Sequence, residues 1–243
     1  MIDKEGLSHH ISQQYNEELE EVRSHLLAMG GLVEKQVTDA ISALIDADTG
    51  LATQVREIDD QINQMERNID EECVRILARR QPAASDLRLI ISISKSVIDL
   101  ERIGDEASKI AKRAIELSEG SSENSKGYVE IRHIGDKVRK MVQEALDAFA
   151  RFDAPLALTV AQQDKAVDQE YKSALRELMT YMMEDPRSIS RVLSVIWVLR
   201  SLERIGDHAR NIAELVIYLV RGTDVRHLGL ARMAEEVESG KNR

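Results

Sequence analysis

Apolar side chains recur every three or four residues over most of the chain, which is the spacing of one face of an α-helix. Turn and cap signals interrupt this pattern at Asp48, Pro82, Asp153 and Asp185, and residues 118–127 lose it altogether in favour of glycine and serine. The pattern predicts six long helices and a short one in the tail, at residues 16–46, 51–80, 85–117, 128–152, 154–184, 186–221 and 228–237.

The second half of the chain repeats the first. The hexapeptide Leu-Glu-Arg-Ile-Gly-Asp stands at residues 100–105 and again at 202–207, and a shift of 102 residues aligns the third predicted helix with the sixth. A shift of 105 aligns the second with the fifth, so the intervening loops differ by three residues. We therefore expect an all-α fold of two tandem three-helix bundles that arose by internal duplication. The predicted units are a first repeat, a linker, a second repeat and a C-terminal tail, at residues 1–117, 118–127, 128–221 and 222–243.

Composition agrees with helices and narrows the class of protein. Aromatic residues make up only 3 % of the 243, against 43 % hydrophobic residues overall, so a β-sandwich is disfavoured. No run approaches the roughly 18 apolar residues of a membrane span, and the N-terminus lacks a signal core, so we expect a cytoplasmic protein without direct membrane insertion. The single cysteine, Cys73, lies on an apolar helix face and is interpreted as a core residue. The net charge of −10 disfavours binding to nucleic acid.

Acidic residues form the most suggestive chemical pattern. Each hexapeptide carries a Glu and an Asp four residues apart, hence on one helix face, and the second helix of each half offers a matching acidic face. If these helices pack antiparallel, four oxygen-bearing side chains converge in each half. The candidate metal ligands are Glu101 and Asp105 with Asp59 and Asn63 in the first half, and Glu203 and Asp207 with Asp164, Asp168 and Asn211 in the second. Hard oxygen ligands suit Mg, Mn, Ca or Fe, with Zn as a further candidate.

The alternative is an ordinary solvated face on which Arg102 or Arg204 neutralises the acids as surface ion pairs. Repetition of the motif favours metal binding, and more strongly in the second half, because Lys109 and Asn63 occupy the corresponding places in the first. The glycine inside each hexapeptide suggests close approach by another backbone or room for an ion. His208 is expected on the surface. No catalytic constellation stands out, so we do not expect an enzyme.

The doubled hexapeptide, the Asn-Ile-Ala triplet at 211–213 and the Ala-Arg-Arg-Gln-Pro segment at 78–82 resemble the signature of the PhoU family, over about residues 8–226. This resemblance implies two three-helix bundles side by side, often in a homodimer, with multinuclear metal sites at the duplicated acidic motifs. Those motifs correspond here to Glu101, Asp105, Glu203, Asp207, Asp164 and Asp168, whereas Asp59 with Asn63 departs from the acidic pattern.

The resemblance also implies a function. Members of the family are not catalysts but negative regulators, which restrain phosphate uptake and repress the phosphate-starvation response when phosphate is plentiful. They are thought to link the ATPase subunit of the phosphate transporter, PstB, to the histidine kinase PhoR at the inner membrane. Two other hypotheses stay open: a metal-storage or metal-chaperone bundle without specific partners, and a purely structural tether that binds no metal.

Overall fold

A computed structural model describes residues 13–118 and 128–239, and within them the chain is helical without strands. The elements are α1 (Gln13–Ile45), α2 (Thr49–Arg80), α3 (Ala84–Ser118), α4 (Tyr128–Arg151), α5 (Ala154–Glu184), the short 3₁₀ helix η2 (Pro186–Ser188), α6 (Ile189–Arg221) and α7 (Leu230–Ser239). The predicted all-α fold of two tandem bundles is confirmed. Of the predicted linker, Ser118 ends α3, and the other residues lie outside the described part of the chain.

Local chemistry sets the helix ends where the sequence signals indicated them. The Asp48 carboxylate accepts a hydrogen bond from the backbone N–H of Leu51 at 2.9 Å and so caps α2. Asp153 caps α5 in the same way through the N–H of Leu156, also at 2.9 Å. Gly222 caps the C-terminal end of α6, and its φ of 78° lies in the left-handed region that glycine adopts without strain.

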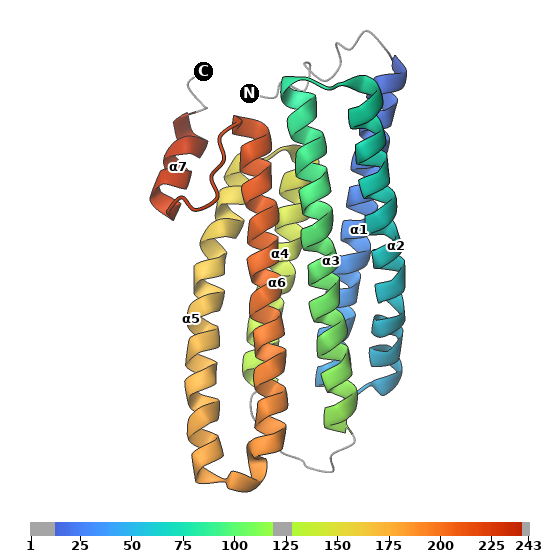
Figure 1. Cartoon of the computed structure of the whole chain (residues 1–243). Coiled ribbons are helices and arrows are strands. Elements are labelled where there is room, and N and C mark those ends of the chain that lie inside the picture. Colours follow the sequence, from blue (N-terminus) through green and yellow to red (C-terminus); the bar gives the residue numbers. More distant parts are fainter. Residues whose placement is uncertain (1–12, 119–127, 240–243) are drawn as a thin grey trace.

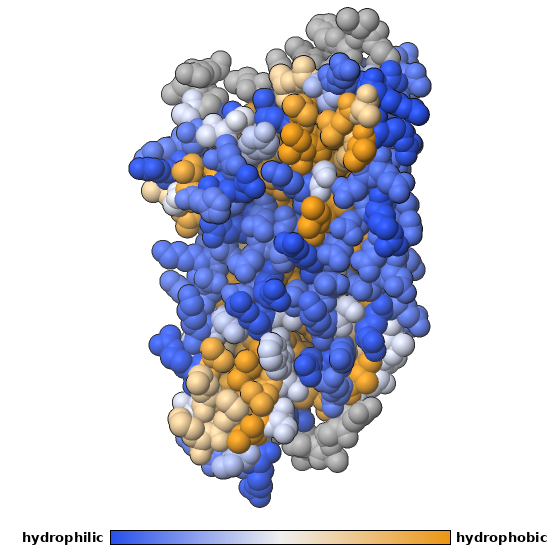
Figure 2. All heavy atoms as spheres, in the orientation of Figure 1, coloured by the Kyte–Doolittle hydropathy of each residue, from blue (hydrophilic) through white to orange (hydrophobic). Residues whose placement is uncertain are grey.

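The two bundles lie side by side (Figure 1). Helices α3 and α6 pack along each other in antiparallel directions, α1 packs against α4 behind them, and α2 and α5 cover the outer flanks. The short α7 packs against α5. On the face of Figure 2 the middle of the molecule is hydrophilic, and apolar regions lie towards two opposite ends.

A pseudo-two-fold axis relates the halves, and the packing of α1 against α4 demonstrates it. A Cβ on Gly30 would overlap the side chain of Leu146, and a Cβ on Gly135 would lie 3.1 Å from Cδ1 of Ile41. A shift of 105 residues converts the first contact into the second. The duplicated halves therefore meet through equivalent surfaces, with each glycine admitting a large side chain of the other half.

The cores of the bundles join into one continuous apolar cluster that includes the predicted helix seams. Burying a large aliphatic side chain contributes roughly 1.5–3 kcal/mol, so this cluster supplies most of the stabilisation of the fold. Cys73 is 1 % exposed, and burial raises the pKa of its thiol to about 12. Its interpretation as a core residue is confirmed. No helix within residues 13–118 and 128–239 is long and apolar enough to cross a membrane.

Candidate metal centre

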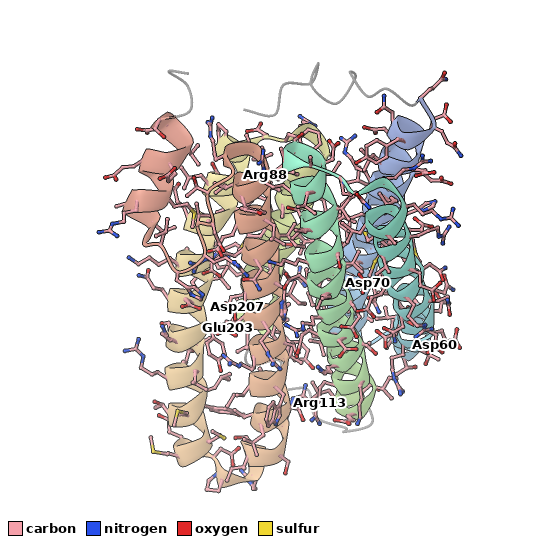
Figure 3. All side chains as sticks on the ribbon, turned by 45° about the horizontal axis from the view of Figure 1, so that its top comes forward. Asp60, Asp70, Arg88, Arg113, Glu203 and Asp207 are labelled. Carbon is pink, nitrogen blue, oxygen red and sulfur yellow. The ribbon has the colours of Figure 1, made fainter. Side chains whose placement is uncertain are left out.

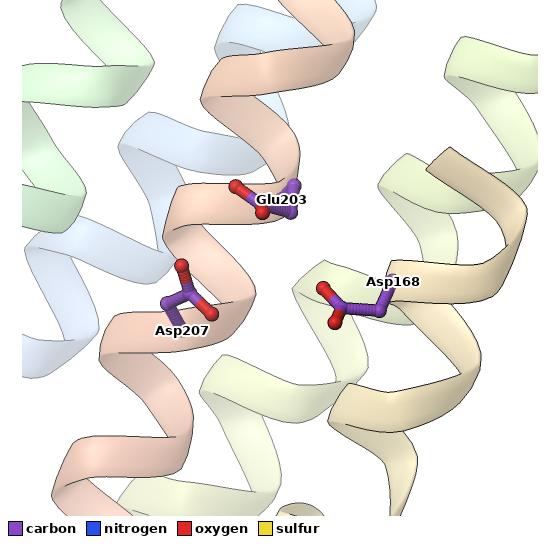
Figure 4. A group of neighbouring side chains, drawn as sticks. All are labelled: Asp168, Glu203 and Asp207. Carbon is purple, nitrogen blue, oxygen red and sulfur yellow. The ribbon is translucent and has the colours of Figure 1, made fainter. Parts of the chain in front are cut away.

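Three carboxylates meet between α5 and α6. Glu203 and Asp207 stand one turn apart along the middle of α6 (Figure 3), and Asp168 projects towards them from α5 (Figure 4). One oxygen from each of the three side chains lies within 4.8 Å of the other two. Glu203 is buried, Asp168 is half-buried and Asp207 is exposed, so the group opens to solvent on one side. Helices α5 and α6 pack antiparallel, as the predicted convergence of acids requires, and this packing brings their acidic residues together.

Asp164 lies one turn before Asp168 on α5 and is also buried. Its carboxylate accepts a hydrogen bond from Nη1 of Arg210 at 3.0 Å, and the same guanidinium donates through Nε to Glu214, also at 3.0 Å. Asp164 is therefore already paired with a cation. It borders the group of three carboxylates and does not belong to it.

The pKa values of Glu203 and Asp207 are raised. Burial is the largest cause for Glu203, followed by the negative charge of Asp207. For Asp207, whose carboxyl group is partly desolvated although the residue as a whole is exposed, desolvation is again first, followed by the charges of Asp164 and Asp168. Acids that are desolvated and close together ionise only at a cost, and a bound cation is the ordinary way to offset it.

Basic side chains offset part of this charge and leave one oxygen without a partner. Arg200 donates through Nη1 to Oε1 of Glu203 at 2.7 Å, and Nζ of Lys172 lies 3.6 Å from Oδ2 of Asp168. The second oxygen of Glu203, Oε2, is buried and has no hydrogen-bond partner. A buried carboxylate oxygen without a donor is costly, and this one belongs to a group of hard oxygen ligands. The residues present therefore fit a small oxygen-seeking cation.

The first half holds a looser version of this arrangement. Burial raises the pKa of Glu101, and the charges of Asp105, Glu66 and Asp59 raise it further. Glu66 was missed from the sequence, although it continues the acidic face of α2 one turn beyond Asn63, where the second half has Tyr171. Nζ of Lys109 lies 3.8 Å from Oδ2 of Asp105. Among the described residues, no three carboxylates of this half come as close together as those of the second.

The side chain of Asn211 contacts the other half of the molecule. Its Nδ2 donates to Oδ1 of Asp99 on α3 at 3.0 Å, and Nδ1 of His208 lies 2.8 Å from the same oxygen. This bond uses the amide nitrogen of Asn211, and the role of its oxygen as a metal ligand stays a prediction. The expectation of a surface position for His208 is wrong because α3 covers its ring. Asp99 is 9 % exposed and was not anticipated.

The arginines also act differently from the sequence expectation. Arg204 donates through Nη1 to Oε1 of Glu106 at 3.0 Å, across the boundary between the halves, and does not neutralise its neighbours in the hexapeptide. Arg200 pairs with Glu203 of the hexapeptide instead, and Arg210 pairs with Asp164 and Glu214 outside it. Their positions three residues before Glu203 and four before Glu214 were the available signal, since side chains at these spacings meet on a helix.

The fold consists of two three-helix bundles related by duplication, and carboxylates lie between the second and third helix of each. These features define a class of helical proteins with one acidic face in each repeat. The model of the PhoU domain family matches residues 26–114 and 131–216, which cover both bundles. The chain belongs to the PhoU family, and the resemblance noted in the sequence is confirmed.

Relatives and solved structures agree with this assignment. The phosphate-specific transport system accessory protein PhoU homolog of Pseudomonas aeruginosa is 82 % identical over 241 residues, which are 99 % of each chain. The corresponding PhoU protein of Escherichia coli is 48 % identical over 94 % of each chain. The crystal structure of PhoU from Pseudomonas aeruginosa aligns with a TM-score of 0.84 at 84 % identity, covering 86 % of this chain and 100 % of that one. PhoU from Streptococcus pneumoniae aligns at 0.80 with 33 % identity, covering 87 % and 99 %.

Proposed function

We propose that this chain is an accessory protein of a phosphate-specific transport system and a negative regulator of phosphate uptake and of the phosphate-starvation response. Similarity to proteins of that name over nearly the whole length, at up to 82 % identity, supports the first part. The regulatory part follows the expectation drawn from the family. The chain is not a catalyst in this proposal.

The proposed action is that of a cytoplasmic adaptor, in the form of a homodimer, between the transporter ATPase PstB and the histidine kinase PhoR at the inner face of the membrane. One continuous core through both halves supports it, because a rigid body can favour one conformation of each partner over another. A ligand that shifts a partner's equilibrium must bind its two states with different affinities, and a rigid surface achieves this more readily than a flexible one.

The proposed metal ligands are Asp168, Glu203 and Asp207, with Asp164 next to them. The buried oxygen of Glu203 that lacks a partner is the single observation that carries this proposal. A cation of Mg, Mn, Fe or Zn would neutralise the mutually repelling acids and tie α5 to α6. The matching residues of the first half, Glu101, Asp105 and Asp59, are proposed as a weaker site because Lys109 already supplies a positive charge there.

A binding experiment tests the adaptor. The full chain is immobilised and offered purified PstB, and separately the purified cytoplasmic part of PhoR. We expect both to bind, and retention of neither would contradict the adaptor.

Elemental analysis of the same preparation tests the metal part. A small fixed number of ions per chain is expected; many reversibly bound ions would favour storage, and none would favour the structural tether. The double variant Glu203→Ala, Asp207→Ala should lose the ion and weaken partner binding and repression of the kinase. The exposed residue Asp136 on α4 provides the control, and Asp136→Ala should leave ion content, partner binding and repression unchanged. Unchanged binding and repression in the double variant would contradict a role for the metal in regulation.

A further inference from the structure

Large apolar side chains are exposed at the end of the α5–α6 hairpin. They are Met179 (52 % exposed), Met183 (76 %), Ile189 (41 %), Leu193 (45 %) and Trp197 (57 %), here called the α5–α6 patch. Figure 2 shows an apolar region over this end of the two helices. Methionine and tryptophan are residue types enriched at protein interfaces, the first because it adapts its shape and the second because it buries a large area.

The first half carries an equivalent patch. Val74 is 65 % exposed and Leu87 is 37 % exposed, and Ile91 beside them is half-buried; these three are the α2–α3 patch. The repeat shift of 105 residues carries Val74 onto Met179. The shift of 102 carries Leu87 onto Ile189 and Ile91 onto Leu193. Apolar residues thus recur at three of the five positions in both repeats, whereas Met183 and Trp197 correspond to Ala78 and Lys95.

The pseudo-two-fold axis sets the two patches at opposite ends of one face. Helices α3 and α6 run antiparallel down the middle of that face, so the N-terminal ends of α3 and α6 point in opposite directions (Figure 1). In Figure 2 apolar regions lie near the ends of α2–α3 and of α5–α6, with a hydrophilic middle between them. The arginines Arg102 on α3 and Arg204 on α6 are exposed and are also equivalent in the repeat.

The exposed area indicates what size of partner the patches suit. If a large side chain offers roughly 200 Å², the exposed fractions amount to on the order of 500 Å² for the α5–α6 patch and on the order of 200 Å² for Val74 and Leu87 of the α2–α3 patch. A stable interface buries roughly 800 Å² on each side. Either patch alone falls short of a stable dimer of this chain, whereas both together approach the area of one specific interface.

We propose that this face binds a two-fold symmetric protein dimer, each subunit of which docks on one of the two patches. Identical subunits present two identical surfaces related by a two-fold axis, and this chain presents two apolar surfaces that are related by its pseudo-axis and share three positions. Engagement at both ends makes the second contact intramolecular and raises the overall affinity. The inference rests on the proposed function, which supplies the partner to test: the ATPase subunits of the transporter, paired as ABC ATPases are.

Calorimetric titration of the purified, paired ATPase subunit PstB with the full chain measures both affinity and stoichiometry. We expect one chain to bind per two ATPase subunits. The matched variants Met179→Glu and Val74→Glu each place a charge in one patch and should weaken binding by about tenfold or more, and the double variant by more than about a hundredfold. Val129 on α4 is 75 % exposed and outside both patches, so Val129→Glu should bind within about twofold of the unaltered chain.

The outcomes separate the two proposals. If the unaltered chain does not bind the ATPase, both the proposed function and this inference fail. If it binds but the patch variants bind equally well, or one chain binds per ATPase subunit, only the inference fails. Sedimentation of the chain alone provides a second readout, because it measures whether the chain dimerises. If Met179→Glu abolishes a dimer of this chain but leaves ATPase binding unchanged, the patch binds a second copy of the chain and the inference is overturned. Thermal melting with midpoints near that of the unaltered chain shows that the variants fold.

Discussion

The Glu203 side chain is buried, yet only one of its two carboxylate oxygens has a partner. Its pKa is raised by burial and by Asp207, so in the metal-free protein the folded state binds a proton there more tightly than the unfolded state does. This contribution to stability is therefore favourable at low pH and is lost as the pH rises through the raised pKa. Ionisation of this group as the pH rises therefore lowers the stability of the metal-free fold.

Glu203→Gln should accordingly have opposite effects on stability and on metal binding. The amide keeps the shape and can still contact Arg200, while the buried charge disappears, so the metal-free variant should be more stable at pH 7 by about 1 kcal/mol. Affinity for the cation should fall by about tenfold or more, because an amide is a weaker ligand than a carboxylate. Chemical denaturation in the presence of a chelator at pH 5 and pH 7 measures the stability of the metal-free protein, and a separate metal titration measures the affinity for the cation. A variant less stable than the parent at pH 7 would contradict this account of Glu203.

The glycines of the two identical hexapeptides, Gly104 on α3 and Gly206 on α6, have different neighbours in the folded protein. A Cβ on Gly104 would lie 2.9 Å from Oε1 of Gln36, a side chain that is itself buried and bonded to the carbonyl of Val55. A Cβ on Gly206 would meet only ordinary contacts, the nearest being Val167 at 3.7 Å. At Gly104 a side chain makes the close approach and not the backbone, which was one of the two possibilities expected from the sequence; nothing approaches Gly206 as closely.

The same alanine substitution should therefore change stability in opposite directions at these two sites. Gly206→Ala should stabilise the protein by up to about 1 kcal/mol through helix propensity. Gly104→Ala should destabilise it by about 1–3 kcal/mol, because the overlap with Gln36 outweighs that gain. Unfolding of both variants in urea measures their free energies of unfolding, and equal changes in the two variants would contradict the prediction.

Element boundaries were predictable to within a few residues because their signals are local. Asp48 and Asp153 cap helices through their own backbone neighbours, and Pro82 ends the second helix by its covalent structure. The acidic faces of α5 and α6 were predictable from helical spacing as well. Which acids are paired with arginine was predictable only in part: the pair of Arg200 with Glu203 follows helical spacing, whereas the bond from Arg210 to Asp164 depends on the position of a neighbouring helix.

At the scale of the whole molecule, polar contacts and close packing join the two halves. Asp99 accepts from Asn211 and contacts His208 across the α3–α6 boundary, and Leu146 fills the space beside Gly30. Removing one half would expose apolar surface of the other together with these polar groups. We therefore expect the duplicated bundles to unfold as one cooperative unit and not as two independent domains.

Scanning calorimetry should show one unfolding transition, with a calorimetric enthalpy close to the van't Hoff enthalpy. Asp99→Ala should lower its midpoint and cost about 1–3 kcal/mol, since His208 and Asn211 lose their shared acceptor. The surface variant Asp136→Ala should leave the midpoint nearly unchanged. Two resolved transitions in the unaltered chain would show that the halves unfold separately.

The sequence by itself determined the helices, their ends, the duplication and the family, since periodicity, caps and a repeated hexapeptide are properties of short stretches of chain. The tertiary structure alone decided that the halves meet antiparallel about a pseudo-two-fold axis. It also decided that Glu203 keeps an oxygen without a partner, that Asn211 contacts Asp99, and that two apolar patches share one face. These features depend on the shapes of side chains about a hundred residues apart, and no local pattern records how such surfaces fit together.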